Sequence, residues 1–445
     1  MTRPSEQAAG RHRVATERLE ASWRALCAPV VPARLIDFYR RGVGVCWVWL
    51  SVGFSLGISG WNLYRAPVLW QEHGVRIPWP GTAWVPVWSP VPGQGMAWIL
   101  IPMLLGGLLL LAELGPPRPI AAVLLGLGLW LLAADRVLFL YHRYLIMHMT
   151  LTLLLPGRDA DSRVSQLDCL PVIGLALAMW SWSAVAKIAW EWPVIWGTQL
   201  QNFGPPVVDA AVAWLFDRLP RMQAFLIGAA LTAVAEIFVA VCLGWPRGTR
   251  AARYAGLWLC GGFALLAPLF AVGAGVTTWT AGRCVEAGRA RVRQQDRQPG
   301  RGLPPNLRHL AILAFLVFHV APPVRTYLLP ERHVTHLGSR WAWRQMSDSR
   351  PGLLKVEAYD PDREAWQDLT PAWHKAHPDI VRQLTVEPCE IAWALAWLAR
   401  RHPELAPLDR LLRLSLPPTD PPEAPVPAAC ADELPPHVRQ VGRVR

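Results

Sequence analysis

Long apolar segments alternate with short polar ones over the central part of the chain. Between residues 43 and 322 charged residues are scarce, and apolar residues run on without the alternation typical of a strand. A helix needs about 20 such residues to cross ~30 Å of hydrocarbon, and in lipid only helices and closed barrels satisfy their own backbone groups. The unalternating Leu-, Ala-, Val- and Gly-rich runs exclude a barrel. The pattern therefore predicts an all-α polytopic membrane bundle of about eight transmembrane helices.

The apolar runs give the bounds of the predicted spans. They lie at residues 43–64, 97–114, 118–134, 137–155, 170–190, 222–245, 255–281 and 307–322. Three further regions flank this bundle: a basic, cytoplasmic or interfacial N-terminal segment, a small α+β extramembrane region, and a Pro-rich tail expected to be disordered. Their bounds are 1–42, 323–403 and 404–445.

Basic residues flank the spans and indicate their orientation. Arginines in 1–41 place the N-terminus in the cytoplasm, in what we expect to be a bacterial inner membrane. Eight spans would return the C-terminus to that side. However, the basic loops 247–253 and 283–303 flank a single predicted span and cannot both be cytoplasmic. Either one span is miscounted or one segment is re-entrant.

Composition narrows the classes of partner. The chain is 53% hydrophobic and only 17% charged, with a formal net charge of +12. Because no nucleic-acid module accompanies this charge, we expect the basic residues to touch anionic lipid headgroups and expect no nucleic-acid partner. The eight cysteines show no metal-ligand spacing, so neither a metal site nor a disulfide framework is expected.

Four ionisable residues fall inside predicted spans: Asp135, His142, Lys187 and Glu236. A charge near the bilayer centre costs at least about 2.5–3.5 kcal/mol on insertion scales, so such residues usually face the bundle interior and carry function. Asp135 and His142 are seven residues apart and share one helix face. These four residues are the candidate site.

Each candidate also has a structural explanation. Asp135 could mark a break between two helices, and His142 could be a packing histidine. Lys187, near a span end, could reach to the interface, and Glu236 could pair with an arginine of the bundle. His148, six residues from His142, faces elsewhere and is taken as structural.

If the set is functional, its chemistry is coherent. A lysine in apolar surroundings loses affinity for its proton, because desolvation disfavours the charged form, and a neutral amine is a general base. A histidine nearby can donate to a developing oxyanion. The substrate that Lys187 and His142 would meet is then lipophilic and enters from the bilayer.

A series of motifs resembles the vitamin K-dependent gamma-carboxylase family and its bacterial relatives, the horizontally transferred transmembrane (HTTM) domain proteins. The segment from Asp135 through Tyr141-His142-Arg143-Tyr144-Leu145 is similar to the family's D-x6-H-x-Y-L pattern, and Lys187 to Trp192 is similar to K-L-x-x-x-W. Further matches follow in order: Glu236 with the arginines after Pro246, Leu329 to His333 (L-P-x-R-H), Trp341 to Met346 with Trp343 and Arg344 (F-S-W-R-M-M), and Pro378-Asp379-Ile380.

The resemblance implies a quinol-handling enzyme with Lys187 as the base and His142 assisting, while Asp135, Glu236, Trp192, His333, Trp343 and Arg344 support the site. In the family, reduced vitamin K is oxygenated to a base strong enough to remove a glutamate γ-proton, and carbon dioxide then adds. The implied cofactors and partners are a menaquinol-like quinol, oxygen, carbon dioxide, membrane lipid and a protein or peptide glutamate.

Departures from the family leave its activity open. Tyr141 replaces an asparagine, Trp180 and Ala184 replace a tyrosine and a glycine, and a histidine expected in the seventh span falls near Gly261. About eight residues are also missing between His333 and Trp341. The alternative is therefore a non-enzymatic membrane protein that binds a lipid or quinone or acts as a partner subunit. A repeat-built transporter has less support.

Overall fold

The computed structural model is mostly helical in the residues that it describes. These are 29–56, 97–134, 141–155, 163–187, 217–245, 247–264, 268–292 and 307–328, three short strands after residue 352, and a few isolated positions. Ten helices lie in this part of the chain: α2 (Ala33–Leu56), α4 (Ala97–Leu111), α5 (Pro117–Ala134), α6 (Tyr141–Thr152), α7 (Gln166–Lys187), α10 (Arg221–Gly244), α11 (Thr249–Ala264), α12 (Pro268–Val292), α13 (Leu307–Phe318) and α14 (Ala321–Leu328).

Two of the described helices are long and apolar enough to cross a membrane, namely α7 and residues Leu226–Gly244 of α10. Three further apolar stretches are shorter, at Ile99–Leu111, Pro117–Ala133 and His309–Val324. Helices α4, α5, α7 and α10 coincide closely with predicted spans. Helix α2 begins ten residues before the span expected at 43–64, and α6 is only 12 residues long.

The span predicted at 255–281 is wrong, because this region contains two helices. Pairs of neighbouring residues show that α11 and α12 are antiparallel: Arg253 bonds Glu286 near one end, and Gly256 faces Thr278 farther along. Helix α12 begins at Pro268. Proline suits the first helical position, where its missing N–H is not needed, and it disfavours helix in the residue before it.

The α11–α12 hairpin changes where the basic segments lie. Arg253 at the start of α11 and Arg283 near the end of α12 share Glu286, so both segments belong to the same end of the bundle. The start of α2 lies there too, because strand β1 (Pro29–Pro32) precedes α2 and pairs with β2 (Arg163–Ser165), which precedes α7. We call this end of the bundle the basic end.

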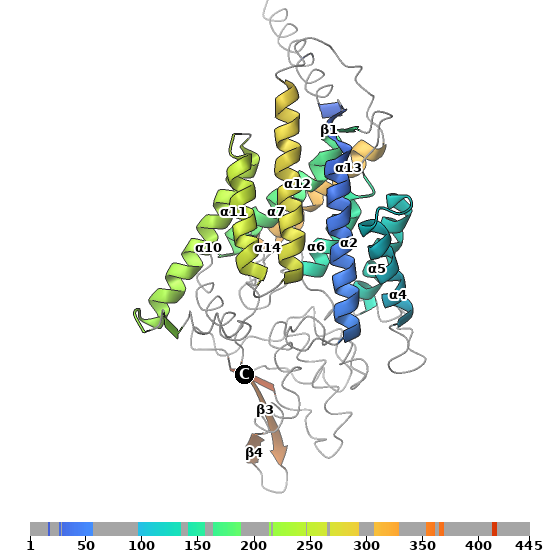
Figure 1. Ribbon diagram of the computed structural model, residues 1–445. Coiled ribbons are helices and arrows are strands. Elements are labelled where there is room, and N and C mark those ends of the chain that lie inside the picture. The colour runs from blue at the N-terminus through green and yellow to red at the C-terminus, as the bar shows by residue number, and fades with distance from the viewer. Residues whose placement is uncertain are drawn as a thin grey trace, which may run out of the picture.

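Helix α12 is the central helix of the bundle. It packs against α2, α6, α7 and α11, and it stands between α11 and α2 in Figure 1. Trp180 of α7 donates from Nε1 to the hydroxyl of Thr278 at 2.8 Å, and Gln166 of α7 lies against Gly288. Because position 180 pairs with 278 and position 166 with 288, α7 and α12 are antiparallel.

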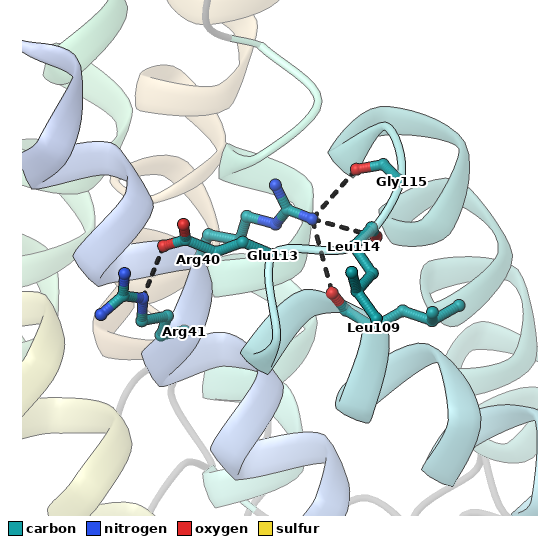
Figure 2. A network of polar contacts seen from close by, with 6 residues as sticks. All are labelled: Arg40, Arg41, Leu109, Glu113, Leu114 and Gly115. Atoms are coloured by element: carbon teal, nitrogen blue, oxygen red, sulfur yellow. Dashed lines mark hydrogen bonds and ion pairs between the residues drawn. The ribbon is translucent and has the colours of Figure 1, made fainter.

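The turn between α4 and α5 is fixed to α2 by Arg40 (Figure 2). Its Nη2 donates to the carbonyls of Leu109, Leu114 and Gly115 at 3.4, 3.3 and 3.1 Å. The last carbonyls of a helix have no partner within it, and a cation is favoured there by the helix dipole. Arg41 forms an exposed ion pair with Glu113, whose φ is 58°. Arg40 therefore caps α4 from a neighbouring helix.

The C-terminal strands form a separate three-stranded antiparallel sheet, in the order β4 (Ala365–Asp368), β3 (Leu353–Asp360), β5 (Leu412–Ser415). Strands β3 and β4 lie in the expected α+β region. Strand β5 falls within the 404–445 segment that we expected to be a disordered tail, and its Leu412 pairs with Val356 of β3. The four residues of β5 form a strand, whereas disorder was expected for them.

Candidate functional site

Two of the predicted site residues are fully described, and they lie together. Lys187 is the last residue of α7, and Glu236 lies in the second half of α10. His142 occupies the first turn of α6, but its side chain is outside the described residues. The remaining predicted site residues also lie outside them: Asp135, Trp192, His333, Trp343 and Arg344.

Lys187 and Glu236 form a bidentate ion pair between α7 and α10. Nζ of Lys187 donates to both carboxylate oxygens of Glu236, at 2.7 and 2.8 Å. It also donates to Oγ of Ser183, one turn earlier on α7. Because an ammonium has three N–H donors and no acceptor, these three oxygens match its full donor capacity.

The pair is shielded from its surroundings on all sides. The side chains of Lys187 and Glu236 are 1% and 0% exposed. The structure therefore does not show either structural alternative considered for these residues, a Lys187 that reaches to the interface or a Glu236 that pairs with an arginine. Glu236 lies eight residues before Gly244, the last residue of α10, about 12 Å along the helix axis.

Helix α10 has its polar side inside and its apolar side outside. Glu236 is fully buried, whereas Leu231, Val234 and Phe238 are 65%, 62% and 46% exposed. A helix on the surface of a soluble protein has the opposite arrangement. The inversion places the one acidic residue of α10 against α7 and leaves an apolar face outward.

An aromatic cluster begins one turn before Ser183 on α7. Trp180 lies there and is fully buried. Its ring stacks on Phe263 with centroids 6.4 Å apart, and Phe263 meets Phe270 edge to face at 5.9 Å. These three rings come from α7, α11 and α12 and join the three helices.

Ser183 and the aromatic residues were not identified from the sequence. The available signal for Ser183 is its spacing of four residues from Lys187, which places both on one helix face. Trp180 entered the sequence analysis only as a departure from the family pattern. The sequence gives no comparable signal for Phe263 and Phe270, which reach the site through the α11–α12 turn.

A second buried cluster joins α6 to α13. His148 and His319 meet edge to face with ring centroids 4.5 Å apart, and His148 also packs on Tyr144 and Phe318. Nδ1 of His319 donates to the carbonyl of Phe315 at 2.7 Å, and Trp182 of α7 donates to the carbonyl of His319. These contacts agree with the packing role expected for His148. His319 was not identified from the sequence.

The geometry permits one proton to be shared within the Lys187–Glu236 pair. A protonated amine facing a carboxylate and a neutral amine facing a carboxylic acid carry the same net charge of zero. Burial disfavours separated charges, so it narrows the free-energy difference between the charged pair and the neutral pair. In the second form Lys187 offers a lone pair and Glu236 holds the displaced proton.

The described residues contain no group of three or more His, Cys, Asp or Glu side chains placed to hold a metal ion. Comparison of the chain with protein-family models, with characterised proteins and with solved structures gave no match.

Proposed function

We propose that this chain is a multi-pass membrane protein. The support comes from the outward faces of its helices, because the core helix of a soluble protein would be covered. The 18-residue apolar window of α10 is only 39% buried, and exposed apolar side chains also line α4 and α13. They include Ile101, Leu105, Leu307, Leu310 and Leu313. Exposed apolar faces of this extent fit lipid better than water.

The basic end faces the cytoplasm in this proposal, in keeping with the excess of Lys and Arg in cytoplasmic loops. The split of residues 255–281 into two helices removes the conflict between the basic segments 247–253 and 283–303. Helix α13 runs parallel to α7, since Leu316 packs at Gly174 and His319 at Trp182. The chain then leaves α14 on the side opposite the basic end.

We further propose that the protein is a quinol-handling enzyme of the carboxylase-like, HTTM type, with Lys187 as the base. One observation carries the proposal: a lysine, a carboxylate and a hydroxyl converge, fully buried, between two long apolar helices. Such groups are expensive to place in a bilayer and usually serve proton transfer or substrate binding there.

Each residue of the cluster has a distinct part in the proposed proton transfer. Glu236 takes a proton from the Lys187 ammonium and leaves a neutral amine. The amine then accepts a proton from a hydroxyl of the quinol, so Lys187 ends charged, Glu236 ends protonated and neutral, and the substrate oxygen carries the negative charge. The Ser183 hydroxyl accepts from Nζ and also bonds Glu236, so it holds the amine and the carboxyl group in register for the transfer.

The surroundings suit a flat aromatic substrate. The aromatic cluster of Trp180, Phe263 and Phe270 begins one turn from Ser183, and aromatic rings favour offset and edge-to-face contacts. In the proposed reaction the reduced quinone and oxygen supply the oxidative chemistry, and carbon dioxide is added to a glutamate side chain. The more specific form of the proposal includes carboxylation of protein or peptide glutamate. The less specific form ends at the quinone epoxide.

The direct experiment incubates the purified protein with reduced vitamin K, oxygen, labelled bicarbonate and a glutamate peptide. The wild-type protein is expected to form epoxide, and Lys187→Ala is expected to form none. Label in the peptide supports the carboxylase version. Equal epoxide formation by both proteins would overturn the role of Lys187, and none from either would overturn the enzyme.

A second candidate function is non-enzymatic, and in it the ion pair only holds α7 and α10 together. The observation that favours it is burial: both side chains are almost fully excluded from solvent, and Glu236 accepts two of the hydrogen bonds that Lys187 can donate. In that case the chain binds a lipid or quinone, or acts as a partner subunit, without turnover. A folded protein that binds quinol but forms no epoxide supports this reading.

A further inference from the structure

The arginines at the turn between α10 and α11 are not equivalent. Arg253 is buried, lies over the ring of Trp279 at 4.5 Å, and donates to Glu286 at 2.6 Å. Glu286 also bonds Arg283, so one carboxylate serves two arginines. Arg247 and Arg250, by contrast, are exposed, and among the described residues no acidic group lies within ion-pair distance of either. This corner of the basic end carries two uncompensated positive charges.

An outward stripe of α11 continues from this corner into the apolar part of the bundle. Arg250, Tyr254 and Trp258 are spaced by four residues and so lie on one face. The guanidinium of Arg250 lies over the Tyr254 ring at 6.0 Å. Tyr254 and Trp258 are 55% and 76% exposed. We call these three residues the α11 stripe.

The order of groups along the α11 stripe follows the order of layers in a lipid leaflet. A cation lies at the end of the helix, a phenol lies one turn below it, and an indole lies about 12 Å from the cation along the helix axis. Tyrosine and tryptophan favour the membrane–water interface, where an apolar ring and a polar group are both satisfied. Leu257, next to Trp258 on α11, is also exposed, at 40%.

From this arrangement we propose that Arg247 and the α11 stripe form a binding site for an anionic phospholipid. The phosphate lies at Arg247 and Arg250, the glycerol region lies against Tyr254, and an acyl chain follows Trp258. Charge complementarity selects the anionic headgroup, and the exposed rings of Tyr254 and Trp258 below the two cations select a lipid over a soluble anion. This site rests on the proposed membrane location but is independent of the proposed enzyme activity.

The test uses the full-length protein purified in detergent and titrated with phosphatidylglycerol or phosphatidylcholine of the same acyl chains, with bound lipid counted by native mass spectrometry. The double variant Arg247→Gln/Arg250→Gln is expected to bind phosphatidylglycerol about 10- to 30-fold more weakly, since each basic residue near a lipid surface contributes a similar share. Its binding of phosphatidylcholine is expected to stay unchanged.

Arg218 provides a matched control at the other end of α10. It is also exposed, lies over the Trp214 ring at 4.1 Å, and donates to the carbonyl of Trp214. Arg218→Gln removes one exposed charge from a comparable arginine–aromatic contact and is expected to bind phosphatidylglycerol as the wild type does. Arg250→Lys, which keeps the charge, is expected to retain binding and shows that a loss in the glutamine variant is not misfolding.

Three outcomes would overturn the site. The first is equal loss of phosphatidylglycerol in Arg218→Gln and in the double variant, and the second is equal loss of both lipids. The third is full displacement of the lipid by inorganic phosphate, which would make the surface a site for a free anion. A protein that stays soluble without detergent would instead overturn the membrane location itself, so the two failures are distinguishable.

Discussion

Two ion pairs of this molecule use the same chemistry in opposite surroundings. At the basic end Arg41 pairs with Glu113, and their side chains are 57% and 32% exposed. Between α7 and α10 Lys187 pairs with Glu236, and these are 1% and 0% exposed. Exposed pairs contribute little, because water and salt screen them. A buried pair costs several kcal/mol in desolvation per ion and persists only with close geometry and further hydrogen bonds.

The comparison teaches how charge is used along the bundle axis. At the basic end Arg253 and Arg283 share Glu286, and Arg247 and Arg250 are exposed. In the bundle interior one base meets one acid and one hydroxyl. Excess charge at an end needs no partner, but a charge in the interior does. The Lys187–Glu236–Ser183 cluster is therefore the more specific feature.

The largest expected effect comes from breaking the buried pair one residue at a time. Lys187→Met or Glu236→Leu leaves a buried charge without its partner and should destabilise the protein by about 3–5 kcal/mol. The double variant should recover most of that loss, because it leaves no buried charge. Reversible unfolding in mixed detergent measures all three. Additive losses in the double variant would contradict a direct pair.

A charge on the outward face of α10 should have the next largest effect. Leu231 is 65% exposed, and Leu231→Arg should raise the apparent free energy of membrane insertion by about 2.5–3.5 kcal/mol. A translocon insertion assay on α10 measures this, with Leu231→Phe as the control. If the arginine were tolerated as well as the phenylalanine, this face would meet water or protein rather than lipid.

Replacing each of the two arginines that share Glu286 should change the stability by a different amount. Arg253→Ala removes a nearly buried, charge-assisted hydrogen bond and should cost about 1.5–3 kcal/mol of unfolding free energy. Arg283, at 43% exposure, should contribute little when replaced by alanine. Thermal unfolding of both variants checks this order. The reverse order would show that Arg283, and not Arg253, holds the α11–α12 hairpin.

The smallest effect is expected where Arg40 caps α4. Arg40→Ala removes the donor to three backbone carbonyls and should cost about 1 kcal/mol. Arg41→Ala, its neighbour, removes only an exposed pair and should leave stability unchanged. Hydrogen exchange at residues 109–115 should rise in the first variant alone. Equal protection in both variants would leave Arg40 without a capping role.

The features best predicted from the sequence are those that depend on a single helix. The span expected at 222–245 is α10 at Arg221–Gly244, and Lys187 and Glu236 were selected because charges are rare in apolar runs. Their pairing was not predicted, because it joins residues 49 apart through helix packing. The split at Pro268 was missed because proline is tolerated inside membrane helices, so the apolar run alone did not place a break there.

The measurement that tests the central claim most directly is quinol-dependent epoxide formation by wild type and by the Lys187→Met/Glu236→Leu double variant, compared at equal folded fraction. The double variant is expected to keep the fold and lose the proton-accepting amine. Epoxide from the wild type and none from the folded double variant is the predicted result. Epoxide from both, or from neither, would contradict the account of the buried pair as a proton-transfer site.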